Sequence, residues 1–172
     1  MRIRTARYAD LEAIADIYNG EVLGSVATMD TVPRSAAEFE AWLEDHPPHT
    51  YPVFVAEAGG DGTVVGWASL TAFSLRLGYQ RCAEVSVYVH RDQRAAGIGT
   101  ALLSELVRVA PSVGIRHLLA RIESSGEASL RLHARHGFER VGTLHDVAEK
   151  FGRVLDVVLM ERRLGHASQR PD

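Results

Sequence analysis

The sequence predicts a mixed α/β (α+β) fold with a mostly antiparallel sheet of about seven strands, and two patterns carry that prediction. The first is a run of three strand-like segments, 53–57, 64–72 and 83–89, with no helix between them, which favours antiparallel neighbours. The second is a strand, a glycine-containing loop, a helix and a further strand between residues 85 and 122, which predicts one parallel crossover. The predicted order, β-α-α-β-β-β-α-β-α-β-β, lacks the uniform alternation of a Rossmann fold.

Two N-terminal helices are predicted from their capping residues. Asp10 precedes a series of apolar residues at helical spacing, and Gly24 ends that series. Ser35 is followed three residues later by Glu38, which is the capping-box pattern, so a second helix is expected to begin there. Pro47 stops it, because proline cannot continue a helix.

The remaining elements follow from alternation, glycine positions and apolar spacing. The Gly-Gly-Asp-Gly stretch at 59–62 predicts a hairpin turn, and residues 73–81 are expected to be irregular. Ser125 is expected to cap a helix that Gly137 closes. The other predicted segments are a strand at 3–6, a helix from the glycine loop to about 113, and strands at 117–122, 138–147 and 155–161.

Composition limits the class of protein. The 172 residues are 46% hydrophobic and 24% charged, and a net charge of −3 gives no electrostatic reason to expect a nucleic-acid or membrane partner. One cysteine, Cys82, allows neither an intramolecular disulfide nor a zinc cluster, so no metal site is expected. No apolar run approaches the roughly 20 residues of a membrane span, and no signal segment follows Met1. These features predict a single cytoplasmic domain over 1–164 with a disordered tail at 165–172.

The segment Arg94-Ala-Ala-Gly97-Ile-Gly99 is the strongest chemical signal in the chain. It follows a strand and opens a leucine-rich helix at Thr100, so its backbone N–H groups converge at a helix N-terminus, where an anion is stabilised. Gly97 and Gly99 let the backbone approach phosphate oxygens without an intervening Cβ. A P-loop would need Gly-Lys-Ser/Thr here, and a Rossmann fingerprint would need a third glycine near Leu102. A tight turn of small residues remains the alternative for so short a pattern.

Two segments resemble the markers of the GNAT N-acetyltransferase superfamily. Arg94-x-x-Gly97-x-Gly99, after Val87-Tyr88-Val89, is similar to its acetyl-CoA signature, and 129–138, which ends in Gly-Phe, is similar to its second marker. The resemblance covers residues 3 to about 164 and implies the GNAT acyl-CoA N-acyltransferase fold, with helices on both faces of the sheet and acetyl-CoA as co-substrate. The cofactor-binding positions that it implies are Val87, Tyr88, Val89, Arg94, Ala95, Ala96, Gly97, Ile98, Gly99, Thr100, Gly126 and Ser129.

A narrower resemblance is to the phosphinothricin and methionine sulfoximine acetyltransferases, which acetylate the α-amino group of small amino-acid analogues. It rests on short segments spread over the chain, among them 18–22, 30–34, 66–69, 76–79, 84–89 and 150–152. It implies a homodimer and a small amino-acid-like molecule as the other substrate.

Glu84 and His133 are the candidate catalytic residues. Glu84 begins an otherwise apolar strand, where a carboxylate is costly unless it is paired or partly solvated, and the resemblance implies a catalytic glutamate at this position. His133 stands where the branch has a histidine, which can act as acid or base near neutral pH. A backbone N–H of 87–89 is expected to stabilise the oxyanion. Cys82 is interpreted as a packing residue rather than as a covalent acetyl carrier.

Arg76, Tyr79 and Met29 are the predicted substrate-binding residues. Arg76 and Tyr79 lie in the irregular segment, and a guanidinium there would bind a carboxylate or phosphinate through two parallel hydrogen bonds. Met29 stands where the branch has an aromatic residue of the amino-acid pocket. The chain departs from the superfamily at Ala95, which replaces a glycine and is expected to keep a negative φ, and at Gly126, which replaces an asparagine that contacts the cofactor.

The function predicted from these residues is acetyl transfer from acetyl-CoA to the α-amine of a small amino-acid-like substrate, by direct attack in a ternary complex. One alternative is a GNAT enzyme that acts on protein N-terminal or lysine amines. Another is a non-catalytic module that binds acyl-CoA. Arg76 favours a small anionic substrate over the first alternative, and the presence of both Glu84 and His133 favours an enzyme over the second.

Overall fold

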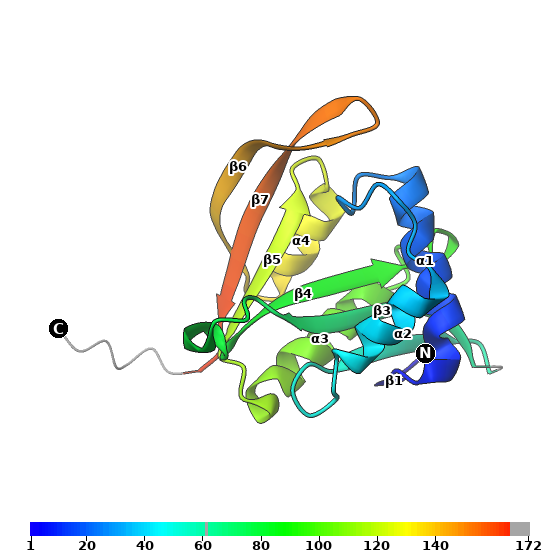
Figure 1. The fold of residues 1–172 in the computed structure, drawn as a ribbon. Coiled ribbons are helices and arrows are strands. Elements are labelled where there is room, and N and C mark those ends of the chain that lie inside the picture. The colour runs from blue at the N-terminus through cyan, green and yellow to red at the C-terminus, as the bar shows by residue number, and fades with distance from the viewer. Residues whose placement is uncertain (61, 166–172) are drawn as a thin grey trace.

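The computed structural model describes residues 1–60 and 62–165, so most of the tail predicted at 165–172 lies outside the described residues. A seven-stranded sheet has the strand order β1-β2-β3-β4-β5-β7-β6 and carries four α-helices (Figure 1). The strands are β1 (Arg2–Thr5), β2 (Val53–Ala58), β3 (Thr63–Ala72), β4 (Cys82–Val89), β5 (His117–Glu123), β6 (Glu139–Lys150) and β7 (Arg153–Arg163). The helices are α1 (Leu11–Gly24), α2 (Ala36–Glu44), α3 (Ile98–Val109) and α4 (Glu127–Arg135).

The sheet is antiparallel except between β4 and β5, as the predicted crossover requires. These two parallel strands pair only over residues 82–84 and 117–119. Beyond Glu84 they diverge, while β4 stays paired with β3 as far as Val89 (Figure 1). The sheet is therefore split along half the length of β4, and we call this opening the β4–β5 split.

Alternation along the strands sends side chains to two separate cores. The larger core packs α3 against one face of the sheet, with Ala68, Ala83 and Val85 facing Leu102 and Leu106. The other core packs α1 and α2 against the opposite face and is rich in aromatic rings. Its buried members are Leu11, Ile14, Ile17, Tyr18, Val22, Phe39, Val55 and Trp67. Helices therefore cover both faces, as the family resemblance implied, and burial of these apolar side chains is the main favourable term in folding.

Most predicted elements are present, and the capping box of α2 is confirmed. Ser35 accepts a hydrogen bond from the backbone N–H of Glu38, whose carboxylate accepts one from the backbone N–H of Ser35 at 2.7 Å. The predicted cap at Ser125 is wrong. Gly126 occupies the N-cap of α4, because the backbone N–H and hydroxyl of Ser125 both donate to the carboxylate of Glu123.

Several boundaries differ from the sequence prediction. Helix α3 ends at Val109, and a 3-10 turn, Ala110–Val113, continues it because Pro111 lacks the N–H that would extend the α-helix. Strand β6 runs from Glu139 to Lys150 rather than over 138–147, and β7 likewise exceeds the predicted 155–161. Another 3-10 turn, Leu77–Tyr79, lies within the segment expected to be irregular.

Candidate active site

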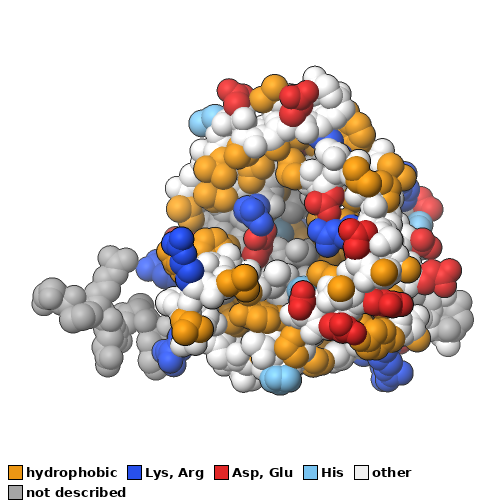
Figure 2. Space-filling view, in the orientation of Figure 1, with side chains coloured by type: hydrophobic (Ala, Val, Ile, Leu, Met, Phe, Trp, Pro, Cys, Tyr) orange, Lys and Arg blue, Asp and Glu red, His pale blue; other side chains and the backbone are white. Residues whose placement is uncertain are grey.

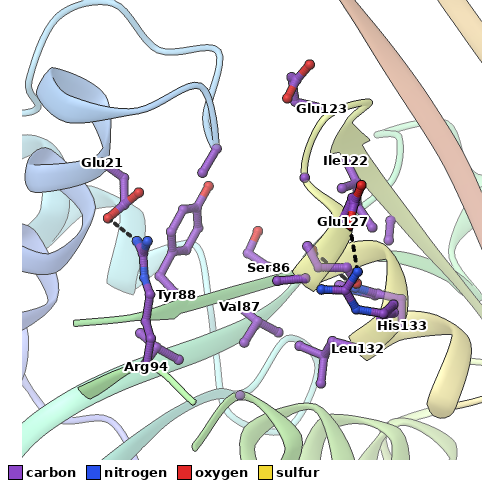
Figure 3. A pocket seen from close by; sticks show the side chains of 18 of the residues that line it. Glu21, Ser86, Val87, Tyr88, Arg94, Ile122, Glu123, Glu127, Leu132 and His133 are labelled. Carbon is purple, nitrogen blue, oxygen red and sulfur yellow. Dashed lines mark hydrogen bonds and ion pairs between the residues drawn. The ribbon is translucent and has the colours of Figure 1, made fainter. Parts of the chain in front are cut away.

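A cavity of about 810 Å³ opens at the β4–β5 split. Its walls come from β4, the loop before α3, the end of β5, helix α4 and the segment after α1. Figure 2 shows a hollow on this face of the molecule, with acidic and basic side chains around it, and Figure 3 shows the cavity from close by. Both candidate catalytic residues, Glu84 and His133, line it.

Two backbone N–H groups of β4 point toward this cavity without a partner on β5. The N–H of His90 donates to the carbonyl of Val65 at 2.9 Å, so the even-numbered residues of β4 bond to β3 and the odd-numbered ones turn their amides toward β5. Since the described part of β5 pairs with β4 only as far as Glu84, the amides of Val87 and Val89 point into the split. These amides have the direction that an oxyanion contact would require.

The loop before α3 has two residues in left-handed conformation. Gly97 is the N-cap of α3 with a φ of 79° and makes no side-chain capping bond. Ala95 has a φ of 63°, so the prediction of a negative φ at this position is wrong. The first α-helical bond runs from the N–H of Ala101 to the carbonyl of Gly97 at 3.0 Å, which leaves the preceding amides of 98–100 at the cavity wall. Such converging amides form an anion-binding concavity.

The side chain of Arg94 fastens this loop to α1 rather than entering the cavity freely. Its Nη2 donates to Oε1 of Glu21 at 2.5 Å, and the Glu21 carboxylate is almost fully buried (Figure 3). The other Glu21 oxygen accepts from the hydroxyl of Ser25 at 2.6 Å. Nη2 of Arg91 donates to the carbonyl of Gly20 at 2.9 Å. Two arginines thus hold the loop against α1.

His133 lines the cavity, and one of its imidazole nitrogens has no hydrogen-bond partner among the described residues. Its Nδ1 lies 2.8 Å from the carbonyl of Ser129 and therefore donates, which makes Nε2 the unprotonated nitrogen of the neutral ring. Nε2 is buried and has no hydrogen-bond partner among the described residues. Burial lowers the pKa of His133, so the neutral ring is favoured. The ring packs edge-on against Phe138, which fixes its orientation.

Glu84 is held by Arg121, which the sequence prediction missed. Nε and Nη2 of Arg121 donate to the two carboxylate oxygens of Glu84 at 2.8 and 2.7 Å. These hydrogen bonds raise the pKa of Arg121 above its already high value. The one sequence signal was a charged residue in the middle of a predominantly apolar strand, His117-Leu-Leu-Ala-Arg-Ile-Glu123.

Glu84 and His133 approach the cavity from opposite faces of the sheet. Glu84, an even-numbered β4 residue, lies on the face opposite Ala83 and Val85, which pack against α3. His133 belongs to α4, which lies on the α3 face (Figure 1). The two side chains reach one cavity because the sheet is split between them, and Figure 3 shows Ser86 of β4 and His133 on facing sides of it.

The structure does not bring the three predicted substrate residues into the wall of this cavity. Arg76 and Tyr79 are exposed in the β3–β4 connection, and Met29 is 36% exposed in the segment after α1. The Tyr79 ring packs edge-on against Phe73 with centroids 5.3 Å apart. Phe73 in turn lines a second, smaller cavity of about 280 Å³ that also includes Glu84. Tyr79 therefore contacts a residue of the smaller cavity's wall but is not itself part of that wall.

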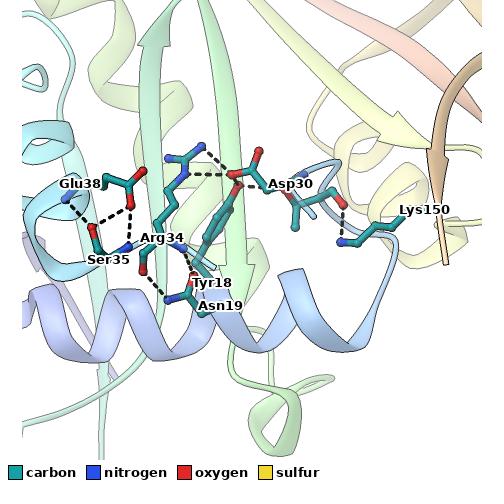
Figure 4. Close-up of polar contacts among 8 residues, drawn as sticks. Tyr18, Asn19, Asp30, Arg34, Ser35, Glu38 and Lys150 are labelled. Atoms are coloured by element: carbon teal, nitrogen blue, oxygen red, sulfur yellow. Dashed lines mark hydrogen bonds and ion pairs between the residues drawn. The ribbon is translucent and has the colours of Figure 1, made fainter. Parts of the chain in front are cut away.

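A polar network orders the α1–α2 connection that carries Met29 (Figure 4). Asn19 exchanges two hydrogen bonds of 2.9 Å with the backbone of Arg34. The Tyr18 hydroxyl donates to Asp30 at 2.7 Å, and Asp30 pairs with Arg34 at 2.8 Å. Lys150, at the end of β6, reaches across to donate to the carbonyl of Thr28 at 2.8 Å. These contacts hold residues 25–27 at the rim of the main cavity.

Gly126 and Ser129 both line the cavity at the start of α4. A Cβ on Gly126 would lie 2.9 Å from the carbonyl oxygen of Glu123, closer than side chains tolerate. The turn therefore requires glycine here, which gives a physical reason for the departure from the superfamily's asparagine. The Ser129 hydroxyl lies 3.4 Å from Nδ1 of His133. Within the described residues there is no group of three or more His, Cys, Asp or Glu side chains suited to a metal ion.

The fold and the site together define a class of protein, and comparison with known families agrees with it. Residues 3–159 match the family model described as the acetyltransferase (GNAT) domain. The chain belongs to this family and is an N-acetyltransferase. Among the described residues, no helix has the length and apolar character needed to cross a bilayer.

Individual relatives place the chain in the predicted branch. It is 38% identical over 169 residues to the L-methionine sulfoximine/L-methionine sulfone acetyltransferase of Pseudomonas aeruginosa, covering 98% of each chain. Its structure is similar to that of a phosphinothricin acetyltransferase from Sinorhizobium meliloti in complex with acetyl-CoA, with a TM-score of 0.93, 37% identity and coverage of 99% and 92%. It is also similar to a ribosomal-protein-alanine N-acetyltransferase from Brucella melitensis, with a TM-score of 0.91, 40% identity and coverage of 95% and 100%.

Proposed function

We propose that this protein transfers the acetyl group of acetyl-CoA to the α-amine of a small amino-acid-like substrate by direct attack in a ternary complex. One observation carries the proposal: a single cavity passes through the split sheet, with the anion-binding amides and His133 toward one face and Glu84 toward the other. The two reactants can therefore enter from opposite faces and meet within the split. Names of relatives that act on methionine sulfoximine and phosphinothricin support this substrate class.

Main-chain amides are proposed to hold the cofactor and to stabilise charge. The diphosphate of acetyl-CoA would meet the amides of 98–100, and the Val87 amide would stabilise the carbonyl oxygen as negative charge develops on it. Gly99 supports this arrangement, because a Cβ there would lie 3.3 Å from Leu132 and 3.8 Å from Val89. The absence of a side chain keeps the loop, α4 and β4 close together.

Glu84 and His133 are proposed to accept the proton that the amine of the substrate must lose. Acetyl-CoA supplies the thioester carbon, and the new nitrogen–carbon bond forms as the carbon–sulfur bond breaks, so that coenzyme A leaves as its thiolate. The ammonium form of the substrate must first lose a proton, and Glu84 lies on the face from which the substrate would enter. In the neutral ring of His133, Nε2 is an acceptor without a partner among the described residues, which suits a base rather than an acid.

The test is thiol release measured against a panel of amino acids that includes methionine sulfoximine and phosphinothricin. Glu84→Gln and His133→Ala are each expected to lower turnover by about 10²–10⁴-fold, the usual contribution of a general acid or base. Affinity for coenzyme A, measured by calorimetry, should stay nearly constant, because the proposed cofactor contacts are backbone amides. Unchanged turnover in both variants would refute the assignment, and absence of any heat of binding with coenzyme A would refute the cofactor site.

Acetylation of a protein N-terminus is a second candidate function, favoured by the similarity to the ribosomal-protein-alanine enzyme. A peptide with an N-terminal alanine belongs in the same panel for that reason. Transfer to the peptide with no transfer to free amino acids would establish this alternative. Transfer to free amino acids alone would exclude it.

We also propose a homodimer, as the branch resemblance implies. Five large apolar side chains of the β6–β7 hairpin are 42–61% exposed, and an apolar surface of this kind is typical of an interface. They are Val141, Leu144, Val147, Phe151 and Val154. Sedimentation equilibrium is expected to give twice the chain mass, and a strictly monomeric profile would contradict the proposal.

A further inference from the structure

Arg121 lies where it can contact both Glu84 and a bound substrate. It is an odd-numbered residue of β5, whose even-numbered neighbours Leu118, Ala120 and Ile122 face the α3 core. Its side chain therefore lies on the same face of the sheet as Glu84. Arg121 and Glu84 line both the main cavity and the smaller one. The Arg121 side chain is 63% exposed, although its carboxylate partner is only 22% exposed.

Glu84 occupies only one edge of the Arg121 guanidinium. A guanidinium has five N–H groups arranged in a plane, and the contact with Glu84 uses the edge formed by Nε and Nη2. The adjacent edge, formed by Nη1 and the second N–H of Nη2, has no acceptor among the described residues. This edge has the spacing that binds a carboxylate through two parallel hydrogen bonds.

The other arginines of the main cavity are placed differently. Arg94 is paired with Glu21 at the loop, and Arg131 is paired with Glu127 on α4. Arg135 also belongs to α4, on the opposite side of the split from Glu84. Among the described arginines that line the main cavity, only Arg121 shares a wall with Glu84.

We propose that Arg121 binds the α-carboxylate of the substrate through this open edge and thereby selects amines that carry a carboxylate on the adjacent carbon. This inference rests on the function proposed above. With the carboxylate on one edge of the guanidinium and Glu84 on the next, the α-amine, one carbon from the carboxylate, lies beside the Glu84 oxygens. An amine without a carboxylate lacks this anchor, and an amine several bonds from its carboxylate is displaced from Glu84.

The smaller cavity indicates the kind of substrate side chain. Beyond Glu84 and Arg121, its wall is formed by Phe73, Leu119, Leu159 and Ala120, all of them apolar. Its volume of about 280 Å³ accommodates an uncharged amino-acid side chain of medium length. The substrate class is therefore an α-amino acid with an uncharged side chain and a free carboxylate.

The test compares two substrates in each of several variants. Wild type and Arg121→Met are assayed by thiol release with L-methionine sulfone and with the amine obtained by removing its carboxylate. Loss of the pair with Glu84 is expected to lower kcat/KM for both substrates alike. Loss of the charge-assisted hydrogen bonds to the carboxylate is expected to lower the ratio of kcat/KM for the amino acid to kcat/KM for the amine by roughly 10- to 150-fold, mainly through KM for the amino acid. The ratio of the two kcat/KM values is independent of the fraction of enzyme that is folded.

Two control variants identify the residue that is responsible for selectivity toward the substrate with a carboxylate. Arg108→Met removes another exposed arginine that pairs with a glutamate, Glu105 on α3, but it lies outside both cavities and should leave the ratio unchanged. Arg76→Met tests the residue predicted from the sequence. The proposal is overturned if Arg76→Met rather than Arg121→Met removes the selectivity, or if Arg121→Met lowers activity equally toward both substrates. Failure of wild type to acetylate either substrate would refute the proposed function instead.

Discussion

Replacing Gly97 by alanine tests the conformation of the proposed diphosphate-binding loop. Gly97 has a φ of 79°, and a Cβ built on it meets no atom within 4 Å. Steric contact therefore adds nothing, and the effect of Gly97→Ala comes from the backbone alone. Gly78 is a matched control, because its Cβ would also meet nothing within 4 Å and its φ lies outside the left-handed range.

The change in the free energy of unfolding caused by Gly97→Ala is the sum of two opposing contributions. An alanine in the left-handed region costs about 1–2 kcal/mol. Replacing glycine also restricts the unfolded chain, which stabilises the folded protein by about 0.4–1 kcal/mol. Gly97→Ala should therefore lower the free energy of unfolding by roughly 0.5–1 kcal/mol, whereas Gly78→Ala should raise it by about 0.4–1 kcal/mol. The two variants are expected to differ by about 1–2 kcal/mol, or roughly 2–8 °C in Tm for a chain of this size.

Thermal and urea unfolding with and without coenzyme A measure both effects. The added methyl group at Gly97 projects into open space at the cavity wall, where phosphate oxygens would approach the amides. Coenzyme A should therefore raise the Tm of Gly97→Ala less than it raises that of Gly78→Ala. Equal stability changes in the two variants would show that Gly97 is not held in the left-handed conformation in solution. Equal shifts with coenzyme A would show that the ligand does not approach this residue.

Two further predictions concern stability. Leu106→Ala, at a fully buried position of α3, is expected to cost about 2.7–5 kcal/mol in urea unfolding, whereas Leu75→Ala, at a position 96% exposed, should change stability by less than about 0.5 kcal/mol. Burial lowers the pKa of His46 and of His133, so below the ordinary histidine pKa of 6.5 the unfolded chain binds more protons than the folded one. The free energy of unfolding should therefore fall as the pH drops below about 6.5, by up to about 1.4 kcal/mol per pH unit for each histidine, and His46→Gln should reduce that slope between pH 5 and 7. An unchanged slope would mean that His46 protonates equally in both states.

Local patterns were enough to predict the order of the elements and the mixed, mostly antiparallel sheet, whereas the helices on both faces followed from the family resemblance. Alternation in 83–89 and the Ser35–Glu38 capping box each depend on residues close together in the chain, and both are present as predicted. The parallel crossover followed from chain order, because a strand, a helix and a strand of that length return in the same direction. The choice of Glu84 and His133 depended on the family resemblance, and the structure places both in one cavity.

The features that the sequence did not predict depend on contacts between distant segments or on turn geometry. Arg121 meets Glu84 across 37 positions of the chain, and neither residue type identifies its partner. Ala95 adopts a positive φ in the loop before α3, although alanine by itself disfavours that conformation. Ser125 would cap a helix by its residue type, but the carboxylate of Glu123 competes for its hydroxyl.

The split between β4 and β5 explains how Glu84 and His133, on opposite faces of a sheet, line one cavity. In a continuous sheet, the even-numbered side chains of β4 and the residues of α4 would be separated by a layer of hydrogen-bonded backbone. Ending the pairing at Glu84 removes that layer over 85–89 and exposes the Val87 and Val89 amides at the same point. The opening in which the two substrates are proposed to meet would therefore also supply the hydrogen-bond donors proposed for their reaction. Arg121, on the strand across the split, then holds Glu84 at the rim of that opening.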